Sequence, residues 1–524
     1  MKVEKIGFGE IDTFSPIFLD YLAEKDALKE FYRYSIQLDS FKEAINERSS
    51  FSENHRKTLV NVLKKQYSSI DTPEAVTENI NSLANNNTFT VVTGHQLNIF
   101  TGPLYFIYKI VTTYKLAQKL KEAYPEYNFV PVYWMASEDH DFAEINHFNL
   151  FGKQIKWETD QTGPVGRFTT EGMVENLNLN GMGDEIEAFL NFYKKEDTLA
   201  KAHLSLVNYL FGKDGVVTID ADHPELKSIF APIIKEDIFS EKSNELTEKQ
   251  TGALTDLGYK SQVYSRDINF FYLKDDLRER IVKTDSGDYK TVNEVAQWTK
   301  EELSSEIEQH PERFSPNVIM RPVYQETILP NLAYIGGPAE VAYWLQLKLV
   351  FDYYDTFFPV LMPRNFALTL NKANVKKYEK LEIGTKQLFI PFEEQKKDFI
   401  EKLTENEIKL NEQKKGLAKV FDEIKDKAAE IDKSLQGFVG SEMAKSMKSI
   451  DNIEKRLQKA EEKRHEITLN QLESLLNKLF PNGSLQERHD NFLNFYLNHP
   501  KFIEHLKSAF DPFDFTFNIL FEDE

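Results

Sequence analysis

Cysteine is absent from the 524 residues of this chain. That absence excludes thiolate nucleophiles, disulfides, iron–sulfur ligation and cysteine-based zinc sites, so any metal would have to bind histidine and carboxylate side chains. Long apolar runs are also absent, since no stretch approaches the roughly 20 apolar residues of a membrane-spanning helix. Residues 1–5 carry no apolar signal core. We therefore expect a cytoplasmic protein without a membrane partner.

Basic residues are relatively scarce: 64 Lys and Arg stand against 84 Asp and Glu, which gives a net charge of -20. This charge repels phosphate backbones, and no stripe of Lys and Arg alternates with aromatic residues, so nucleic acid is an unfavourable partner. The chain is too long for a single hydrophobic core. The composition therefore predicts two or three domains that act on small molecules.

A strand–helix–strand unit is indicated near the middle of the first half. Apolar strands are expected at 89–93 and 129–136, with a helix between them at 104–121. This order is typical of a parallel sheet with a right-handed crossover. Open α/β sheets bind their ligands beyond the carboxyl ends of the strands, at loops that lead into helices. The sequence therefore predicts an α/β enzyme with its chemistry at that edge.

The loop after the first of these strands carries candidate anion-binding groups. Glycine allows close backbone approach, and a helix start offers unpaired N–H groups to a phosphate or carboxylate. The loop matches neither the Walker sequence nor the dinucleotide fingerprint. A tight turn whose histidine only forms hydrogen bonds is the simpler interpretation. The candidate residues are Gly94, Thr101, Gly102 and Lys109 for binding and His95 for catalysis.

Four ionisable side chains occur in succession at 138–141, directly after the second strand. Such a density of charge shifts pKa values and is how acid–base sites are made, so Glu138, Asp139 and His140 are candidate catalytic residues. Asp139, His140 and His147 could alternatively hold a divalent metal, as in a metallohydrolase. The structural alternative is an acidic cap on a helix that begins near residue 142.

Two later segments carry further groups suited to anions. Strands are expected at 318–322 and 358–362, with Arg321 and Arg364 at their ends, where a guanidinium can grip a carboxylate through two hydrogen bonds. A Gly-Gly-Pro turn then opens a helix expected through residues 340–353. Each group alone is more often part of a structural ion pair. The candidate binding residues here are Arg321, Gln325, Gly336, Gly337, Glu340 and Arg364.

The composition changes after about residue 391 to a segment rich in Lys, Glu, Gln and Leu. Apolar side chains spaced three, four or seven residues apart extend over 410–438 and again over 443–467, which is a heptad pattern. Gly437 and Gly440 interrupt it, so we expect two long helices that fold back as an antiparallel hairpin.

Three positions where this heptad pattern calls for an apolar side chain, the seam positions, are charged instead: Glu407, Lys414 and Arg464. They would weaken a simple two-stranded coil and could mark a contact with a second subunit or with the main domain. Solvated helical surface is the alternative. On this pattern a homodimer formed through the coiled coil is one of two open interpretations.

Five separated blocks, in this order, resemble the bacillithiol biosynthesis cysteine-adding family, BshC. The blocks are TGHQLNIFTGPLYFIYK at 93–109, WMASEDHDFAEINH at 134–147, RPVYQETILPNLAYIGGPAEVAYW at 321–344, PR at 363–364 and LQERHDNFL at 485–493. The resemblance spans almost the whole chain. The family usually reads Thr-Gly-Gln-Gln where this chain has His95. An amide cannot replace an imidazole as a base, so the resemblance does not imply such a role for His95.

The resemblance implies a Rossmann-like parallel sheet core with connecting-peptide insertions, plus an α-helical coiled-coil domain used for dimerisation. The expected domains are a core at 1–390, a helical hairpin at 391–480 and a C-terminal segment at 481–524 that packs back on the core. The implied activity is a ligase that joins the carboxyl of L-cysteine to the amine of glucosaminyl malate, in the last step of bacillithiol synthesis.

The resemblance leaves the activation of the carboxyl open. No cofactor is certain, and ATP is a candidate co-substrate through a cysteinyl adenylate, by analogy with the mycothiol ligase. On this interpretation Glu138, Asp139 or His140 lie near the amine, and Arg321 or Arg364 bind the malate carboxylates. Arg488 would lie near a nucleotide, and no residue is assigned to a metal. The alternatives are the metallohydrolase and a non-catalytic coiled-coil scaffold.

Overall fold

The computed structural model describes residues 1–177, 179, 186–403 and 409–523. The chain divides into two compact units, of which the first comprises Met1–Thr369 with Ser484–Leu520 and the second Leu370–Gly483 with Phe521–Glu524. This division assigns residues 370–390 to the helical unit, whereas the sequence-based division assigns them to the core. No helix among the described residues is long and apolar enough to span a membrane.

A five-stranded parallel sheet forms the centre of the first unit, in the order β13-β12-β2-β3-β6. This sheet confirms the predicted Rossmann-like α/β core. Its strands are nearly continuous apolar runs, as a sheet covered on both faces requires. They are β2 (Thr88–His95), β3 (Asn128–Met135), β6 (Val217–Asp220), β12 (Asn331–Gly336) and β13 (Val360–Pro363).

Helices cover this sheet and connect its strands. The crossover from β2 to β3 is α5 (Tyr105–Ala123), as the sequence predicts, and its buried face carries Phe106, Ile110 and Val111. The N-terminal region is mostly helical after β1 (Lys2–Gly7). Other helices of the first unit are α1 (Pro16–Leu22), α2 (Ser40–Arg48), α3 (Glu53–Gln66), α4 (Glu74–Ser82), α9 (Leu199–Phe211), α10 (Pro224–Ser240) and α11 (Lys242–Asp256).

Two predicted elements near the later motifs are wrong. The strand expected at 318–322 is absent; Arg321 instead opens helix α13 (Arg321–Ile328), where a proline in the first turn loses no hydrogen bond. The helix expected over 340–353 is two short helices, α14 (Pro338–Trp344) and α15 (Lys348–Tyr353).

Insertions interrupt the Rossmann-like unit at two places. The first holds a β4–β5 hairpin and the short helices α6, α7 and α8. The second is a five-stranded antiparallel sheet in the order β10-β9-β8-β7-β11, which the sequence did not reveal. The bounds are α6 (Phe142–Ile145), β4 (His147–Leu150), β5 (Lys153–Lys156), α7 (Met173–Asn176), α8 (Glu187–Lys195), β7 (Phe270–Lys274), β8 (Leu277–Lys283), β9 (Tyr289–Thr291), β10 (Gln297–Trp298), α12 (Lys300–Gln309) and β11 (Phe314–Pro316).

The C-terminal segment returns to the first unit. Its last strand lies between the first strand of the chain and β14, giving a three-stranded sheet in the order β1-β15-β14. The elements are β14 (Phe366–Leu370), α21 (Gln486–His489), α22 (Leu493–Tyr496), α23 (Phe502–Ala509) and β15 (Thr516–Phe521). This return brings the last of the five sequence blocks back beside the first.

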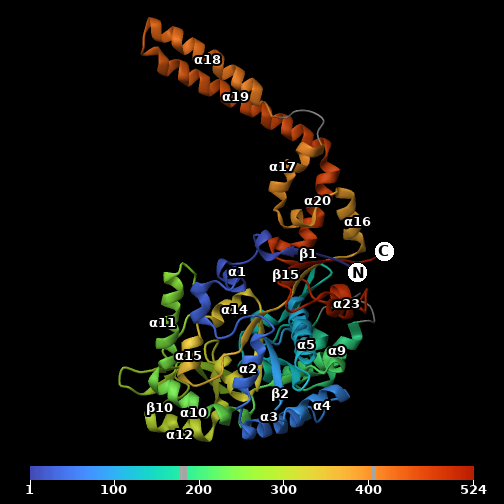
Figure 1. Cartoon of the computed structure of the whole chain (residues 1–524), viewed down its shortest axis with the longest axis vertical. Helices are drawn as coiled ribbons and strands as arrows, with labels where there is room; N and C mark the ends of the chain where they lie inside the picture. Colours follow the sequence, from blue (N-terminus) through green and yellow to red (C-terminus); the bar gives the residue numbers. More distant parts are fainter. Residues whose placement is uncertain (178, 180–185, 404–408, 524) are drawn as a thin grey trace. The chain divides into compact units, whose positions relative to one another are not determined.

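The second unit is helical, and α18 (Asn411–Ile431) and α19 (Leu435–Arg464) run side by side as an antiparallel hairpin (Figure 1). The other helices are α16 (Lys372–Leu381), α17 (Phe392–Leu403) and α20 (Glu466–Leu479). The predicted hairpin is present, but its turn is not at Gly437 and Gly440, which lie inside α19.

The hairpin instead turns at 432–434, where the Ser434 N–H donates to Asp432 Oδ1 at 2.8 Å. An Asp side chain can stabilise such a turn, while an interior glycine costs a helix only about 1 kcal/mol. Lys414, one of the charged seam residues, pairs across the hairpin with Asp451 at 2.8 Å and with Glu454. Glu407 lies outside the described residues.

Candidate functional site

A cavity of about 560 Å³ opens beyond the carboxyl ends of β2, β3, β12 and β13, at the edge of the sheet where the sequence predicts chemistry. Residues from all five sequence blocks line it, together with residues of the inserted antiparallel sheet. The sequence-predicted residues in its wall are Gly94, His95, Lys109, Glu138, Asp139, Arg321, Gly337, Glu340, Arg364 and Arg488. His140, Thr101, Gly102, Gln325 and Gly336 lie outside this wall.

Thr101 and Gly102 form a packed turn and do not face the cavity. Thr101 is fully buried, and both residues have positive φ, 68° and 60° respectively. The Asn491 side-chain amide donates to the carbonyl of Gly102 at 2.6 Å, and a Cβ at this glycine would lie 2.4 Å from the Asn98 Cβ. Glycine is required here for the turn, not for approach to a phosphate, which corrects the sequence-based expectation.

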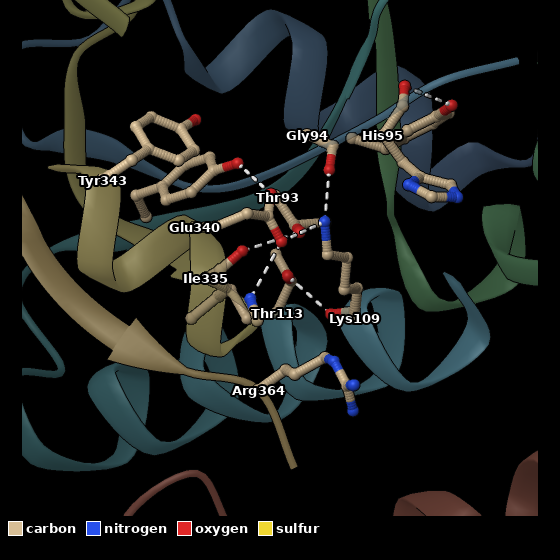
Figure 2. A network of polar contacts seen from close by, with 12 residues as sticks. Thr93, Gly94, His95, Lys109, Thr113, Ile335, Glu340, Tyr343 and Arg364 are labelled. Atoms are coloured by element: carbon tan, nitrogen blue, oxygen red, sulfur yellow. Dashed lines mark hydrogen bonds and ion pairs between the residues drawn. The ribbon is translucent and has the colours of Figure 1, made fainter. Parts of the chain in front are cut away.

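Lys109 and Glu340 form an ion pair in the cavity wall (Figure 2). Lys109 Nζ lies 2.6 Å from Glu340 Oε2 and donates to the Gly94 carbonyl at 2.7 Å. Glu340 also accepts hydrogen bonds from the Gly337 N–H at 2.8 Å and from the Tyr334 hydroxyl at 2.7 Å. Two of the candidate anion-binding groups, Lys109 and the Gly337 N–H, are therefore both bound by Glu340.

This environment shifts the pKa values of both partners. Burial lowers the pKa of Lys109, partly offset by Glu340. Burial would raise the pKa of Glu340, but Lys109, Gly337 and Tyr334 together hold it below its ordinary value. Glu340 is therefore an ionised acceptor, and Lys109 depends on it to stay charged.

Glu138 and Asp139 line the cavity but lie in different environments. Glu138 pairs with Lys227 of α10, which also donates to the Phe314 carbonyl at 2.6 Å. Burial raises the pKa of Glu138, although Lys227 opposes that shift. Sequence patterns gave no sign of Lys227, because it lies on a helix far along the chain. Of the two carboxyl groups, Glu138 is the better proton acceptor.

Asp139 is held as a carboxylate by several donors. It accepts hydrogen bonds from Gln96 Nε2 at 2.8 Å and from its neighbour's backbone, the His140 N–H, at 2.8 Å. Burial would raise its pKa, but the hydrogen bonds from His140 and Gln96 and the charge of Arg278 keep it well below the ordinary value. Asp139 is thus suited to hold a cation rather than to accept a proton.

Arg278 of the inserted sheet is a cavity residue that the sequence analysis missed. Its guanidinium lies 3.9 Å from the centre of the Phe271 ring, 3.6 Å from Asp139 Oδ1 and 2.8 Å from His140 Nδ1. His140 therefore contacts this arginine instead of lining the cavity. No motif marks Arg278, because it lies in a short strand without a characteristic pattern.

Asp139, His140 and His147, the residues of the alternative metal site, do not lie close enough together to bind one metal ion. Among the described residues, no group of three or more His, Asp or Glu side chains could hold a metal ion. His147 is hydrogen-bonded to Asn146, with 3.1 Å between Nδ1 and Oδ1. The geometry therefore gives the metallohydrolase interpretation no support.

His95 lines the cavity as a neutral imidazole. Burial, with the nearby charges of Lys109 and Arg364, lowers its pKa well below the ordinary value. Its ring lies against Tyr105, with 5.2 Å between centroids, and its Nε2 has no hydrogen-bond partner within the described part of the chain.

Besides Arg278, three arginines line the cavity, and they differ in their partners. Arg364 is buried and forms two hydrogen bonds with the carboxylate of Glu487, the longer at 3.1 Å. Arg321 and Arg488 form no ion pair with a carboxylate in the described ranges. Arg488 is exposed, 5.8 Å from the centre of the Tyr105 ring. Among the described residues, no carboxylate therefore lies within ion-pair distance of these two guanidinium groups, although the charge of Glu340 acts on Arg321 from further away.

Comparisons with known proteins agree with these features. Residues 1–365 match the model of the N-terminal Rossmann-like domain of bacillithiol biosynthesis BshC, and residues 367–522 match its C-terminal coiled-coil domain. Proteins named "Putative cysteine ligase BshC" are similar over nearly their whole length. Those of Christiangramia forsetii and Flavobacterium psychrophilum are 43% and 42% identical, each over 99% of both chains. That of Bacillus cereus is 28% identical over 92% of this chain and 93% of the relative.

Proposed function

The chain belongs to the bacillithiol biosynthesis BshC family, and we propose that it joins the carboxyl of L-cysteine to the amine of glucosaminyl malate. The names of the relatives support a cysteine ligase. The observation that carries the proposal is the cavity, in which five distant segments meet and two arginines lack a carboxylate partner. An anionic substrate supplies what those arginines lack.

Arg321 and Arg488 bind the malate carboxylates in this proposal. Charge-assisted hydrogen bonds to carboxylates are strong, and a guanidinium with no acid beside it keeps that capacity. Arg364, the other candidate from the sequence, is already paired with Glu487. It serves the site by holding the C-terminal segment against the connection between β13 and β14.

Glu138 receives the proton that the amine must lose. Amide formation requires the neutral amine nitrogen to attack the carboxyl carbon of cysteine while the bond from that carbon to its leaving group breaks. A carboxyl whose pKa is raised by burial accepts a proton better than one that is strongly hydrogen-bonded. Asp139, which stays ionised, holds the second ammonium group, that of cysteine.

ATP activates the cysteine carboxyl in this scheme: the carboxylate attacks the α-phosphate and pyrophosphate leaves, and AMP is the leaving group when the amine attacks. Free carboxylates do not react with amines without such activation. Lys109 and the Gly337 N–H are the groups suited to phosphate oxygens, and both bind Glu340 in this structure. Glu340 therefore competes with a phosphate for them, which would make nucleotide binding weaker than the number of donors suggests.

Reconstitution tests this function directly. The full-length protein is incubated with labelled cysteine and glucosaminyl malate, with and without ATP, and products are measured by mass. We expect an ATP-dependent product whose mass equals the two substrates less one water. The variant Arg488→Gln should raise the KM for glucosaminyl malate about tenfold, while Lys153→Gln, at an exposed position of β5, should not.

Two outcomes would contradict the proposal. The first is the absence of product although the substrates bind in calorimetric titrations. The second is the absence of heat with ATP, cysteine and glucosaminyl malate alike, which would favour a non-catalytic scaffold.

The helical hairpin is proposed as a dimer interface. Large apolar side chains are exposed along α18 and α19, and the most exposed are Ile431 at 83% and Phe438 at 65%. Covering such side chains is favourable at about 25 cal/mol for each Å² removed from water. A second copy of the hairpin presents the same apolar side chains and would cover them.

A further inference from the structure

The guanidinium of Arg321 is fixed in the cavity wall by neutral groups. Its Nη1 atom donates to Gln325 Oε1 at 3.0 Å, and its Nη2 atom donates to the Tyr343 hydroxyl at 3.2 Å. The rings of Trp134 and Tyr334 lie beside it, with centres 6.0 and 5.6 Å from its central carbon. These contacts hold the group in place without a carboxylate at ion-pair distance among the described residues, and Glu340 acts on its charge only from further away.

The amide of Gln325 has only one favourable orientation. Its side chain is fully buried, and its Nε2 donates to Glu326 Oε1 at 2.8 Å. Glu326 Oε1 also accepts a hydrogen bond from Asn331 Nδ2 at 2.8 Å. A guanidinium can only donate, so the amide must turn its oxygen to Arg321 and its NH₂ to Glu326. The reverse orientation would leave both neighbours of the amide unsatisfied in a buried site.

Helix α13 supplies both members of this arrangement. Arg321 and Gln325 are four residues apart, so their side chains lie on the same face of the helix. A glutamate at position 325 would have nearly the same shape as glutamine and would form the ion pair that Arg321 lacks. An amide, unlike a carboxylate, both donates to Glu326 and contacts Arg321 without neutralising its charge.

We propose that Gln325, oriented by Glu326, is the positioning residue that keeps Arg321 fixed and un-neutralised, so that Arg321 can bind a carboxylate of a small dicarboxylate group. The identity of that group as the malyl part of glucosaminyl malate rests on the proposed function; the rest of the inference does not. Gln325 itself does not line the cavity. It acts through Arg321, and the direct binding role expected from the sequence is replaced by this indirect one.

The substitution Gln325→Glu tests the inference because it adds one negative charge with almost no change of shape. Thr327→Glu is the matched control, since it adds the same charge to the same helix two residues further on, where side chains point to a different face. L-malate and glucosaminyl malate are titrated into each full-length protein by calorimetry. We expect Gln325→Glu to weaken binding at least tenfold and Thr327→Glu to weaken it less than threefold.

A second measurement needs no substrate. Phenylglyoxal modifies accessible guanidinium groups, and the modified peptides are quantified by mass spectrometry. Arg321 should react in the wild type faster than Arg364, which is paired with Glu487, and the substitution Gln325→Glu should slow its reaction at least fivefold. Melting temperatures of all variants identify any that fail to fold.

The outcomes separate the two proposals. If the wild type binds neither malate nor glucosaminyl malate but Arg321 reacts as expected, the proposed substrate is wrong and the inference about Gln325 stands. If ligands bind and Gln325→Glu binds them as the wild type does, the inference is overturned. Slow reaction of Arg321 in the wild type, equal to that of Arg364, overturns it as well.

Discussion

Lys109 of α5 and Glu340 of α14 join two separate strand–helix units by an ion pair of 2.6 Å between Nζ and Oε2. Lys109 is buried, and its charge is removed from water. A buried ion pair adds little stability compared with apolar residues, but removing one partner leaves an uncompensated charge. We therefore expect the largest loss of stability when only one of the two residues is replaced.

Lys109→Met should destabilise the protein by about 3 kcal/mol, because Glu340 then remains a partly buried carboxylate without its main partner. The double variant Lys109→Met with Glu340→Gln should recover at least half of that loss. Thermal and urea unfolding of the four proteins in a double-mutant cycle measure the coupling between the two residues. Equal destabilisation in the single and double variants would show that the ion pair is not the cause.

The proposed role of Glu138 as proton acceptor predicts that the rate of ligation falls at low pH, which is the acid limb of the pH–rate profile. As a proton acceptor it works only when ionised, so ligation should slow as the pH falls through its pKa. Burial raises that pKa above the ordinary 4.5, so the limb should lie above pH 4.5. Glu138→Gln should reduce kcat at least a hundredfold and remove the limb.

The variant Glu138→Asp controls for the loss of shape at this position. It should keep the acid limb with a reduced rate, because a carboxylate is still present. Measurement of kcat from pH 4.5 to 8 distinguishes these cases. An unchanged limb in Glu138→Gln would assign the proton to another group.

The polar strand ends of β2 and β3 could be predicted because each follows an apolar run long enough to be a buried strand. The same logic failed for residues 318–322, where an equally apolar run leads into helix α13. Short apolar runs do not distinguish strand from helix, and here the proline at 322 fits the first helical turn. Arg321 nevertheless lies at the cavity as expected, because helix α13 begins at this edge of the sheet.

Other parts of the site could not be found from the sequence. Arg278 lines the cavity from strand β8, and Lys227 of α10 pairs with Glu138 in the cavity wall; neither carries a local pattern that points to a ligand. Gly102 was misassigned because a glycine in a turn and a glycine beside a phosphate look alike in sequence. Only the positive φ and the contact with Asn98 show that this glycine serves the turn.

Glu326 predicts a pH dependence of stability. Burial raises its pKa to about 7 in the folded protein, although Arg48 and two amides oppose the shift. The ordinary value in an unfolded chain is near 4.5, so the folded state binds the proton more tightly. Stability from this group is therefore full below pH 4.5 and is lost as the pH rises to about 7, by about 3 kcal/mol in total.

The substitution Glu326→Gln removes this titration and keeps an oxygen for Gln325 and Asn331. The melting temperature of the wild type should therefore fall relative to that of Glu326→Gln between pH 5 and pH 7, and the difference should be constant above pH 7.5. Burial also raises the pKa of Asp220, to about 6. Asp220 is present in both proteins, so its effect on the melting temperature is the same in both and does not change the difference between them. Parallel curves over the whole range would contradict the assignment to Glu326.

The exposed apolar side chains of the helical hairpin predict a concentration-dependent dimer. Phe438→Glu combined with Ile431→Glu places charges at the two most exposed of these positions, so the double variant should be monomeric where the wild type is dimeric. Glu430→Gln is the control, because it changes an exposed polar position beside Ile431 without adding charge to the apolar surface. Sedimentation velocity over a hundredfold concentration range measures the mass of each protein. A wild type that stays monomeric throughout would show that these side chains serve another contact, and a double variant that stays dimeric would place the interface elsewhere in the chain.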